Sequence, residues 1–121
     1  MSGVEPMSTP VSRDSAPHYP WGAGCEGWRL VDSSAWTVIE ERVPAGAAEV
    51  RHFHERARQF FYVLTGVAWL EIEGLTHRLP AGSGLEVAPG QRHQFMNQSD
   101  QPVTFLVASV PSTQSDRINL V

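Results

Sequence analysis

Short segments separated by turn residues fill most of this sequence, and this punctuation is the feature that most limits its possible folds. Between Gly22 and Val110, no stretch keeps the apolar repeat of an amphipathic helix. The segments between the turns are rich in β-branched and aromatic residues, as strands are. They are residues 28–31, 35–43, 49–55, 59–66, 67–73, 76–79, 85–88, 89–97 and 102–110. The pattern therefore predicts an all-β sandwich or barrel.

The first 17 residues differ in composition from the rest of the chain. They are rich in serine, proline and small polar residues, so we expect a flexible tail over residues 1–17 and a single domain over residues 18–121. The tail lacks the basic leader and apolar run of a secretory signal. The longest apolar stretch, residues 60–70, is far shorter than the roughly 20 residues of a membrane helix. We expect a cytoplasmic protein with no membrane segment.

Charge and missing residue types exclude several functions. The net charge of −4 argues against a nucleic-acid-binding protein that neutralises phosphates. All nine basic residues are arginine, and the absence of lysine excludes enzymes that form a Schiff base on lysine. Cys25 is the only cysteine, so the chain forms no disulfide within itself. We expect Cys25 to be a small buried apolar side chain.

Two histidines one residue apart, His52 and His54, are the strongest chemical signal. On a strand, both imidazoles leave the same face. Two imidazoles on an interior face need hydrogen-bonding partners, and neutral imidazole is also the commonest ligand for divalent transition metals. The pair alone fits either a polar patch or a metal site. A third histidine, His93, follows a Pro-Gly turn and could enter the same barrel mouth to complete a site of three nitrogens.

The residues around these histidines form two regularly spaced sets. The first set is Gly46, His52, His54, Gln59 and Gly66, and the second is Gly82, Ala88, Gly90, His93 and Asn97. In this order and spacing, over residues 36–110, they resemble the two signature motifs of the cupin superfamily. The resemblance implies a double-stranded β-helix, or jelly-roll barrel. It also implies that His52, His54 and His93 bind one divalent transition metal per chain: Zn, Ni, Fe, Mn or Cu.

Two positions depart from the cupin pattern. Ala88 stands where the motif usually has proline, and Gln59 stands where it usually has glutamate. As a ligand, Gln59 would keep an oxygen donor but remove a negative charge, so the metal would bind less tightly and attract anions more strongly. Alternatively, Gln59 only hydrogen-bonds a bound water. Both roles for Gln59 stay open, and the three histidines are the firmer ligands.

The resemblance implies a metal-dependent enzyme that acts on a small organic molecule, including an anionic one. A dioxygenase and a Lewis-acid isomerase or cyclase are the reaction types that compact cupins suggest. Because Gln59 replaces the usual glutamate, no obvious carboxylate base lies within the motifs, and this counts against proton-transfer isomerisation. The alternative is a non-catalytic cupin module that binds a sugar or another metabolite.

Several further side chains near the motifs have ordinary interpretations. Four arginines lie close to them, namely Arg51, Arg56, Arg58 and Arg92. Arg51 should point away from the interior, and one of the other three could reach a carboxylate or phosphate of the substrate. Residues 22–27 read GAGCEG, but without a following helix they predict a glycine-rich loop and not a nucleotide site. We interpret His18 and His77 as ordinary polar residues.

The strand at residues 59–64 is apolar on both of its faces. One face should line the barrel interior, and a second sheet or a partner subunit should cover the other. Trp69 alternates out of phase with Ala68 and Leu70, which places it on the outer surface. These two features predict a homodimer.

Overall fold

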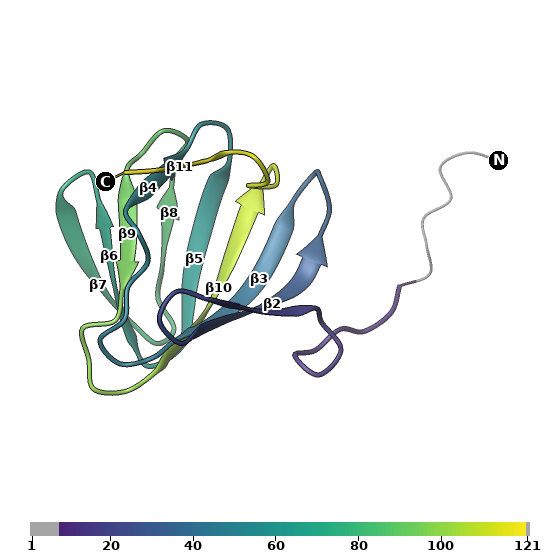
Figure 1. The fold of residues 1–121 in the computed structure, drawn as a ribbon, viewed down its shortest axis with the longest axis horizontal. Coiled ribbons are helices and arrows are strands. Elements are labelled where there is room, and N and C mark those ends of the chain that lie inside the picture. The colour runs from purple at the N-terminus through teal and green to yellow at the C-terminus, as the bar shows by residue number, and fades with distance from the viewer. Residues whose placement is uncertain (1–7, 121) are drawn as a thin grey trace.

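The structure, a computed structural model, describes residues 8–120 and is built from strands and turns (Figure 1). This part of the chain contains no helix long and apolar enough to cross a membrane. The first sheet has the order β1 (His18–Trp21), β2 (Cys25–Asp32), β3 (Thr37–Val43), β10 (Val103–Val110), β5 (Arg58–Thr65) and β8 (Gly84–Val87). The second has the order β11 (Arg117–Asn119), β4 (His52–His54), β9 (His93–Met96), β6 (Val67–Ile72) and β7 (Leu75–Pro80). The prediction of an all-β jelly-roll barrel is confirmed.

The apolar core fills one end of the barrel and leaves the other end polar. Along β10, the inward-facing residues change from Phe105 to Ser109. Phe105 stacks on Phe95 of the other sheet with ring centroids 3.9 Å apart, so these rings join the two sheets. At the polar end, the register places Ser109 between Thr37 on β3 and Gln59 on β5. Apolar packing therefore stabilises one end, and buried polar groups are available for chemistry at the other.

Two strands, β1 and β11, lie outside the segments that the sequence pattern predicts. The turn at residues 22–24 reverses the chain so that β1 pairs with β2, and residues 25–27 begin β2. The expectation of a loop over residues 22–27 is therefore wrong for its second half. A side chain at Gly27 would collide with the ring of Tyr19, so this glycine allows Tyr19 to lie directly on the backbone of β2.

The strand expected over residues 49–55 is reduced to the three residues of β4. Glu49 leaves the strand pattern, because its carboxylate accepts a hydrogen bond from the Phe95 amide of β9. On the other side, residues 55–57 form a turn whose amides are hydrogen-bonded to Asp116. Side-chain acceptors thus take up backbone donors that a longer strand would have used.

The described part of the predicted tail, residues 8–17, makes several contacts with the barrel. The Arg29 amide donates to the Pro17 carbonyl at 2.9 Å, and Ala16 is buried. Arg13 pairs with Glu40 at 3.2 Å. Residues 1–7 lie outside the described residues, and the flexibility of the tail stays a prediction.

The outer face of β5 is exposed in this single chain. Phe60, Tyr62 and Leu64 all present their side chains to solvent, and no second sheet covers them within residues 8–120. Trp69 lies on the face of β6 opposite to the buried Ala68, as its phase predicts. A partner subunit on β5 stays a prediction.

Candidate metal centre

Three histidines meet inside the polar end of the barrel. His52 and His54 leave the same face of β4, and His52 pairs directly across strands with His93 of β9. All three side chains are buried. One ring nitrogen of each lies within 4.8 Å of those of the other two, so the three residues could hold a metal ion. The structure thus brings together the three histidines that the sequence places in two distant motifs.

Backbone carbonyls fix the orientation of two of these rings. His52 Nδ1 lies 2.8 Å from the Val50 carbonyl oxygen, and His93 Nδ1 lies 2.9 Å from that of Gln91. A carbonyl only accepts, so each Nδ1 carries the proton and each Nε2 keeps a free lone pair. His93 Nε2 and His54 Nδ1 are buried with no hydrogen-bond partner among residues 8–120. A buried nitrogen without a partner is energetically unfavourable, and coordination of a metal would supply that partner.

The rings are also held in the protonation state that binds metals. Burial lowers the pKa of His52 to about 3 and the pKa of His54 to about 4, and the neighbouring His93 adds to both effects. Burial likewise lowers the pKa of His93. The three imidazoles are therefore neutral at neutral pH, and a neutral imidazole binds a metal without first losing a proton.

Gln59 faces the same cavity from the opposite sheet. Its Nε2 donates to Ser109 Oγ at 3.1 Å, and this bond leaves the amide oxygen as the free end of the side chain. Gln59 Oε1 is buried and accepts no hydrogen bond from the described residues. The side chain therefore presents an oxygen donor to the cavity, as either of its two expected roles requires.

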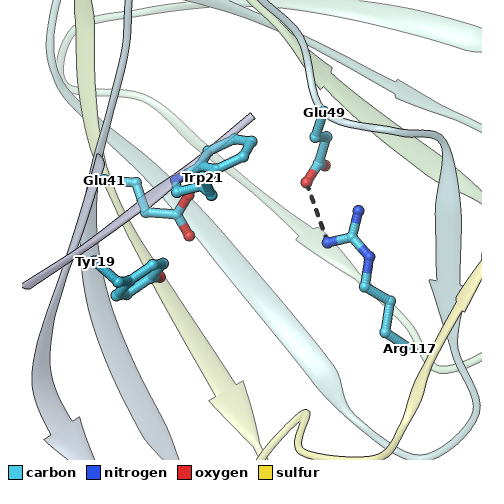
Figure 2. A pocket seen from close by; sticks show the side chains of 5 residues that line it. All are labelled: Tyr19, Trp21, Glu41, Glu49 and Arg117. Atoms are coloured by element: carbon cyan, nitrogen blue, oxygen red, sulfur yellow. Dashed lines mark ion pairs between the residues drawn. The ribbon is translucent and has the colours of Figure 1, made fainter. Parts of the chain in front are cut away.

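A cavity of about 240 Å³ adjoins the histidines and contains charged groups that the sequence analysis did not place there. It is lined by Tyr19, Arg29, Ile39, Glu41, Glu49, His52, His54, Gln59, Phe61, Val107, Ser109, Thr113 and Arg117. Tyr19, Glu41, Glu49 and Arg117 also line a smaller adjoining cavity, together with Trp21. Figure 2 shows Tyr19, Trp21 and Glu41 on one side of that cavity and Glu49 and Arg117 on the other.

Two acidic side chains lie in this cavity, although the sequence analysis found no obvious carboxylate base within the two motifs. Burial and the charge of Glu49 together raise the pKa of Glu41 to about 8, although Arg117 and Arg29 act to lower it. The pKa of Glu49 is raised to about 7, because burial raises it by more than Arg117 lowers it. Glu41 lies on the same face of β3 as Ile39 and Val43, which contact the core. The alternation along the strand therefore indicates that Glu41 faces inward.

Glu49 lies between His52 and Arg117. Its side chain is 11 % exposed, and its Oε1 lies 3.9 Å from His52 Nδ1. Its Oε2 lies 3.8 Å from Arg117 Nη1, the ion pair drawn in Figure 2. Arg117 is held in turn by Asn119 Oδ1 at 2.7 Å and by the Val50 carbonyl at 3.2 Å. Glu49 and Arg117 therefore form a rigid charged wall beside the histidines.

The four arginines near the motifs do not line this cavity. Arg51 pairs with Glu71 at 2.7 Å on the outer surface, as expected. Arg56, Arg58 and Arg92 each lie on the surface beside a carboxylate, of Asp116, Glu86 and Glu73 respectively, and a contact between one of them and a substrate stays a prediction. The arginines of the cavity are Arg29 and Arg117, which lie outside both motifs in the sequence.

The predictions for Cys25 and His18 agree with the structure. Cys25 is buried in the core. His18 lies on the surface, where its Nε2 is 3.0 Å from Glu26. The motif glycines Gly46, Gly66 and Gly82 all have positive φ, and a side chain at Gly66 would also collide with the Pro102 carbonyl.

Comparison with known proteins agrees with this architecture. The profile of the cupin domain family matches residues 39–109, which include the three histidines and Gln59. This chain belongs to the cupin family. Protein SchB of Streptomyces halstedii is 33 % identical over 49 residues, a match that spans 40 % of this chain and only 36 % of SchB.

Solved cupin structures superpose over most of the chain. The polyketide cyclase RemF from Streptomyces resistomycificus has a TM-score of 0.80 at 22 % identity, covering 95 % of this chain and 87 % of RemF. A sugar phosphate isomerase of the cupin superfamily from Silicibacter pomeroyi has a TM-score of 0.74 at 27 % identity, covering 86 % of this chain and 76 % of the isomerase. The cupin barrel of this chain is thus shared with enzymes.

Proposed function

We propose that this cupin is a metal-dependent enzyme that transfers a proton on a small organic molecule, as an isomerase or a cyclase does. The observation that carries the proposal is one cavity lined both by neutral histidines and by the Glu41 carboxyl. The similarity of this barrel to a sugar phosphate isomerase and to a polyketide cyclase supports it. The acidic cavity favours proton transfer over the oxygen chemistry of a dioxygenase.

His52, His54 and His93 would hold one divalent metal, namely Zn, Ni, Fe, Mn or Cu, and Gln59 Oε1 would be the fourth protein ligand. The two unpartnered histidine nitrogens and the unpartnered amide oxygen fit this role. When bound, the metal would polarise a carbonyl oxygen of the substrate and make the neighbouring C–H bond more acidic. The neutral donor set leaves the positive charge of the metal uncompensated by its ligands, which favours a substrate that develops negative charge.

Glu41 would carry the proton. A pKa of about 8 lies close to neutral pH, where a carboxyl can both accept a proton from carbon and return it. Glu41 projects from β3 into the space beside the histidines, and the rings of Tyr19 and Trp21 flank the smaller cavity that it also lines. These aromatic rings would shield the reacting group from water.

Exchange of substrate hydrogen for deuterium tests this function directly. A panel of 2-oxo acids and sugar phosphates is incubated with metal-loaded protein in D2O. At least one of these compounds should lose a C–H hydrogen next to its carbonyl to deuterium, and proton NMR measures this loss. Glu41→Gln should slow that exchange by about 100-fold or more, because a positioned general base contributes about that much. Metal content should stay unchanged.

The matched control is Glu40→Gln, since Glu40 lies on the opposite face of β3 and pairs with Arg13. Glu40→Gln should exchange at the wild-type rate. Equal rates in Glu41→Gln and wild type would remove Glu41 from the mechanism. Tight binding of a panel member without any exchange would instead favour the non-catalytic module that binds a sugar or another metabolite.

Two copies of the chain would pair through the outer face of β5, where Phe60, Tyr62 and Leu64 are exposed. A stable interface buries more than about 1,000 Å² in total, so a charge at its centre should separate the subunits. We expect a dimer at tens of micromolar, and a monomer for Leu64→Glu, in sedimentation velocity. Leu75→Glu places the same change on the exposed β7 and should stay dimeric. A monomeric wild-type protein would contradict this pairing.

A further inference from the structure

Arg29 on β2 differs from the other arginine of the cavity. Arg117 pairs with Glu49, whereas the Arg29 guanidinium makes no ion pair and no hydrogen bond with the described residues. It is half-buried, and its Cζ lies 4.5 Å from the centroid of the Tyr19 ring. This cation–π contact holds the guanidinium over the Tyr19 ring but uses none of its five N–H donors. Arg29 is thus positioned, charged and free to bind an acceptor.

Thr37 on β3 provides a second unpartnered donor nearby. Its side chain is 3 % exposed, and its Oγ1 has no hydrogen-bond partner within residues 8–120. Arg29 lies opposite Ile39 in the β2–β3 pairing, and Thr37 is the next residue on that same face of β3. A buried hydroxyl without a partner is costly, which points to a ligand that supplies one.

The two side chains share a cavity of about 390 Å³, which is also lined by Asp32, Ile39, Ser112, Thr113 and Gln114. Arg29, Ile39 and Thr113 line the histidine cavity as well, so the two cavities adjoin at these residues. A molecule that occupies both would reach from Arg29 to the histidines. Hydroxyl and amide groups of residues 112–114 surround the outer part of this space.

We propose that Arg29 and Thr37 form a binding subsite for an anionic oxygen group of the substrate, a carboxylate or a phosphate. The guanidinium offers two parallel N–H donors to two oxygens of such a group, and the Thr37 hydroxyl offers a third donor. The inference rests on the proposed function, since it takes this cavity as the place where the substrate binds. The substrate class is then a small molecule with an anionic group at one end and a metal-binding oxygen at the other.

The other charges around Arg29 allow an anion to bind. Most Glu41 side chains are protonated and uncharged at neutral pH, because burial raises the pKa to about 8 even though the charge of Arg29 acts to lower it. Asp32 is exposed at the mouth and makes no ion pair with Arg29. Arg117 lies on the other sheet, where Glu49 balances its charge. The uncompensated positive charge therefore lies at Arg29.

Binding of small anions to the metal-free full chain tests this subsite without any need for catalysis. Inorganic phosphate and pyruvate are added in turn as probes. The Arg29 Nε–H resonance is followed by ¹⁵N NMR during each titration. At least one probe should bind saturably at millimolar concentrations and shift that resonance. Arg29→Gln should weaken binding by about tenfold or more, because a hydrogen bond to a charged group contributes about 1.5–3 kcal/mol. The tighter probe identifies the group as a carboxylate or a phosphate.

Further variants separate this subsite from general charge effects. Thr37→Val keeps the shape of the side chain and should weaken binding by about threefold, as the loss of a neutral hydrogen bond does. Arg78→Gln removes an exposed arginine of β7 that makes no ion pair within residues 8–120, and it should bind like wild type. Arg29→Lys keeps the charge but loses the two parallel N–H donors of the guanidinium, so it should bind with intermediate affinity.

Two results would overturn the subsite: equal binding by Arg29→Gln and wild type, or no binding of either probe to the wild type. A failed deuterium exchange with intact anion binding would reject the proposed enzyme and leave the subsite standing. Exchange activity that needs Glu41 but is indifferent to Arg29→Gln, with unchanged anion binding, would reject the subsite alone.

Discussion

Replacing His93 or His52 with alanine is expected to leave the protein almost without metal, whereas the wild-type chain should carry about one divalent ion. Each histidine supplies one of three neutral nitrogens, and no carboxylate ligand compensates for its loss. His93 Nε2 is buried with no other partner in the described chain, so a bound metal would supply the partner that it lacks. Metal per chain is measured by plasma mass spectrometry on protein purified without an affinity tag.

His77→Ala is the matched control, because His77 lies on β7 and does not line the histidine cavity. Gln59→Ala should reduce metal content as strongly as the histidine variants if Oε1 is a ligand, and less if Gln59 only holds a water. Gln59→Glu should tighten binding, since it places a negative charge beside a cation. Unchanged metal in both His52→Ala and His93→Ala would show that the histidines are ordinary polar residues, and the proposed enzyme would lose its chemical basis.

Asp116→Ala should lower the free energy of unfolding by about 3 kcal/mol, because it leaves several backbone donors without a partner. The Asp116 side chain is buried, at 3 % exposure. Its carboxylate accepts from the amides of Glu55 at 3.0 Å, Arg56 at 3.1 Å and Ala57 at 2.9 Å. These amides belong to the turn between β4 and β5, so one side chain fixes the connection that leads from His54 to Gln59. Urea denaturation measures the loss.

Asp100→Ala is the control, since Asp100 is exposed and should change stability by no more than about 0.5 kcal/mol. Burial by itself would raise the pKa of Asp116, but the hydrogen bonds from Ala57 and Arg56 outweigh it and lower that pKa. A depressed folded-state pKa means that this stabilisation is present above the unfolded pKa of about 3.9 and is lost as pH falls through the folded value. A change below about 1 kcal/mol in Asp116→Ala would contradict the role of Asp116 in holding the turn between β4 and β5.

The parts of this protein that could be predicted are those with a local signature. The turn glycines and the alternation of apolar residues mark the long strands, and the two motifs mark the histidines. The short strands β1 and β11 have none of these signs, because every residue of β11 and half of β1 is exposed and no buried face repeats along them. Their positions depend on pairing with β2 and β4, which residue patterns do not reveal.

The cavity residues divide in the same way. Glu41 lies in phase with the inward-facing residues of β3, so an alternation rule applied strictly would have found it. Arg117 could not be found so, because its place beside Glu49 depends on the contact between the C-terminal segment and β4. Arg29 and Thr37 are notable because their polar groups have no hydrogen-bond partner among the described residues. The sequence does not show which residues lie near each other, so it could not reveal this.

Because β1 is an edge strand, ligand preference and folding can change separately in this barrel. β1 pairs with β2 alone, so the ladder from β2 to β8 is complete without it, yet Tyr19 and Trp21 of β1 form one wall of the cavity beside Glu41. Substitutions at Tyr19 alter the shape offered to a ligand while leaving the histidines and the core untouched, whereas Trp21 also packs against the core. Evolution, or a designed library, can therefore diversify ligand preference at Tyr19 at little risk to folding, and the first strand is the natural place to redirect this barrel to new molecules.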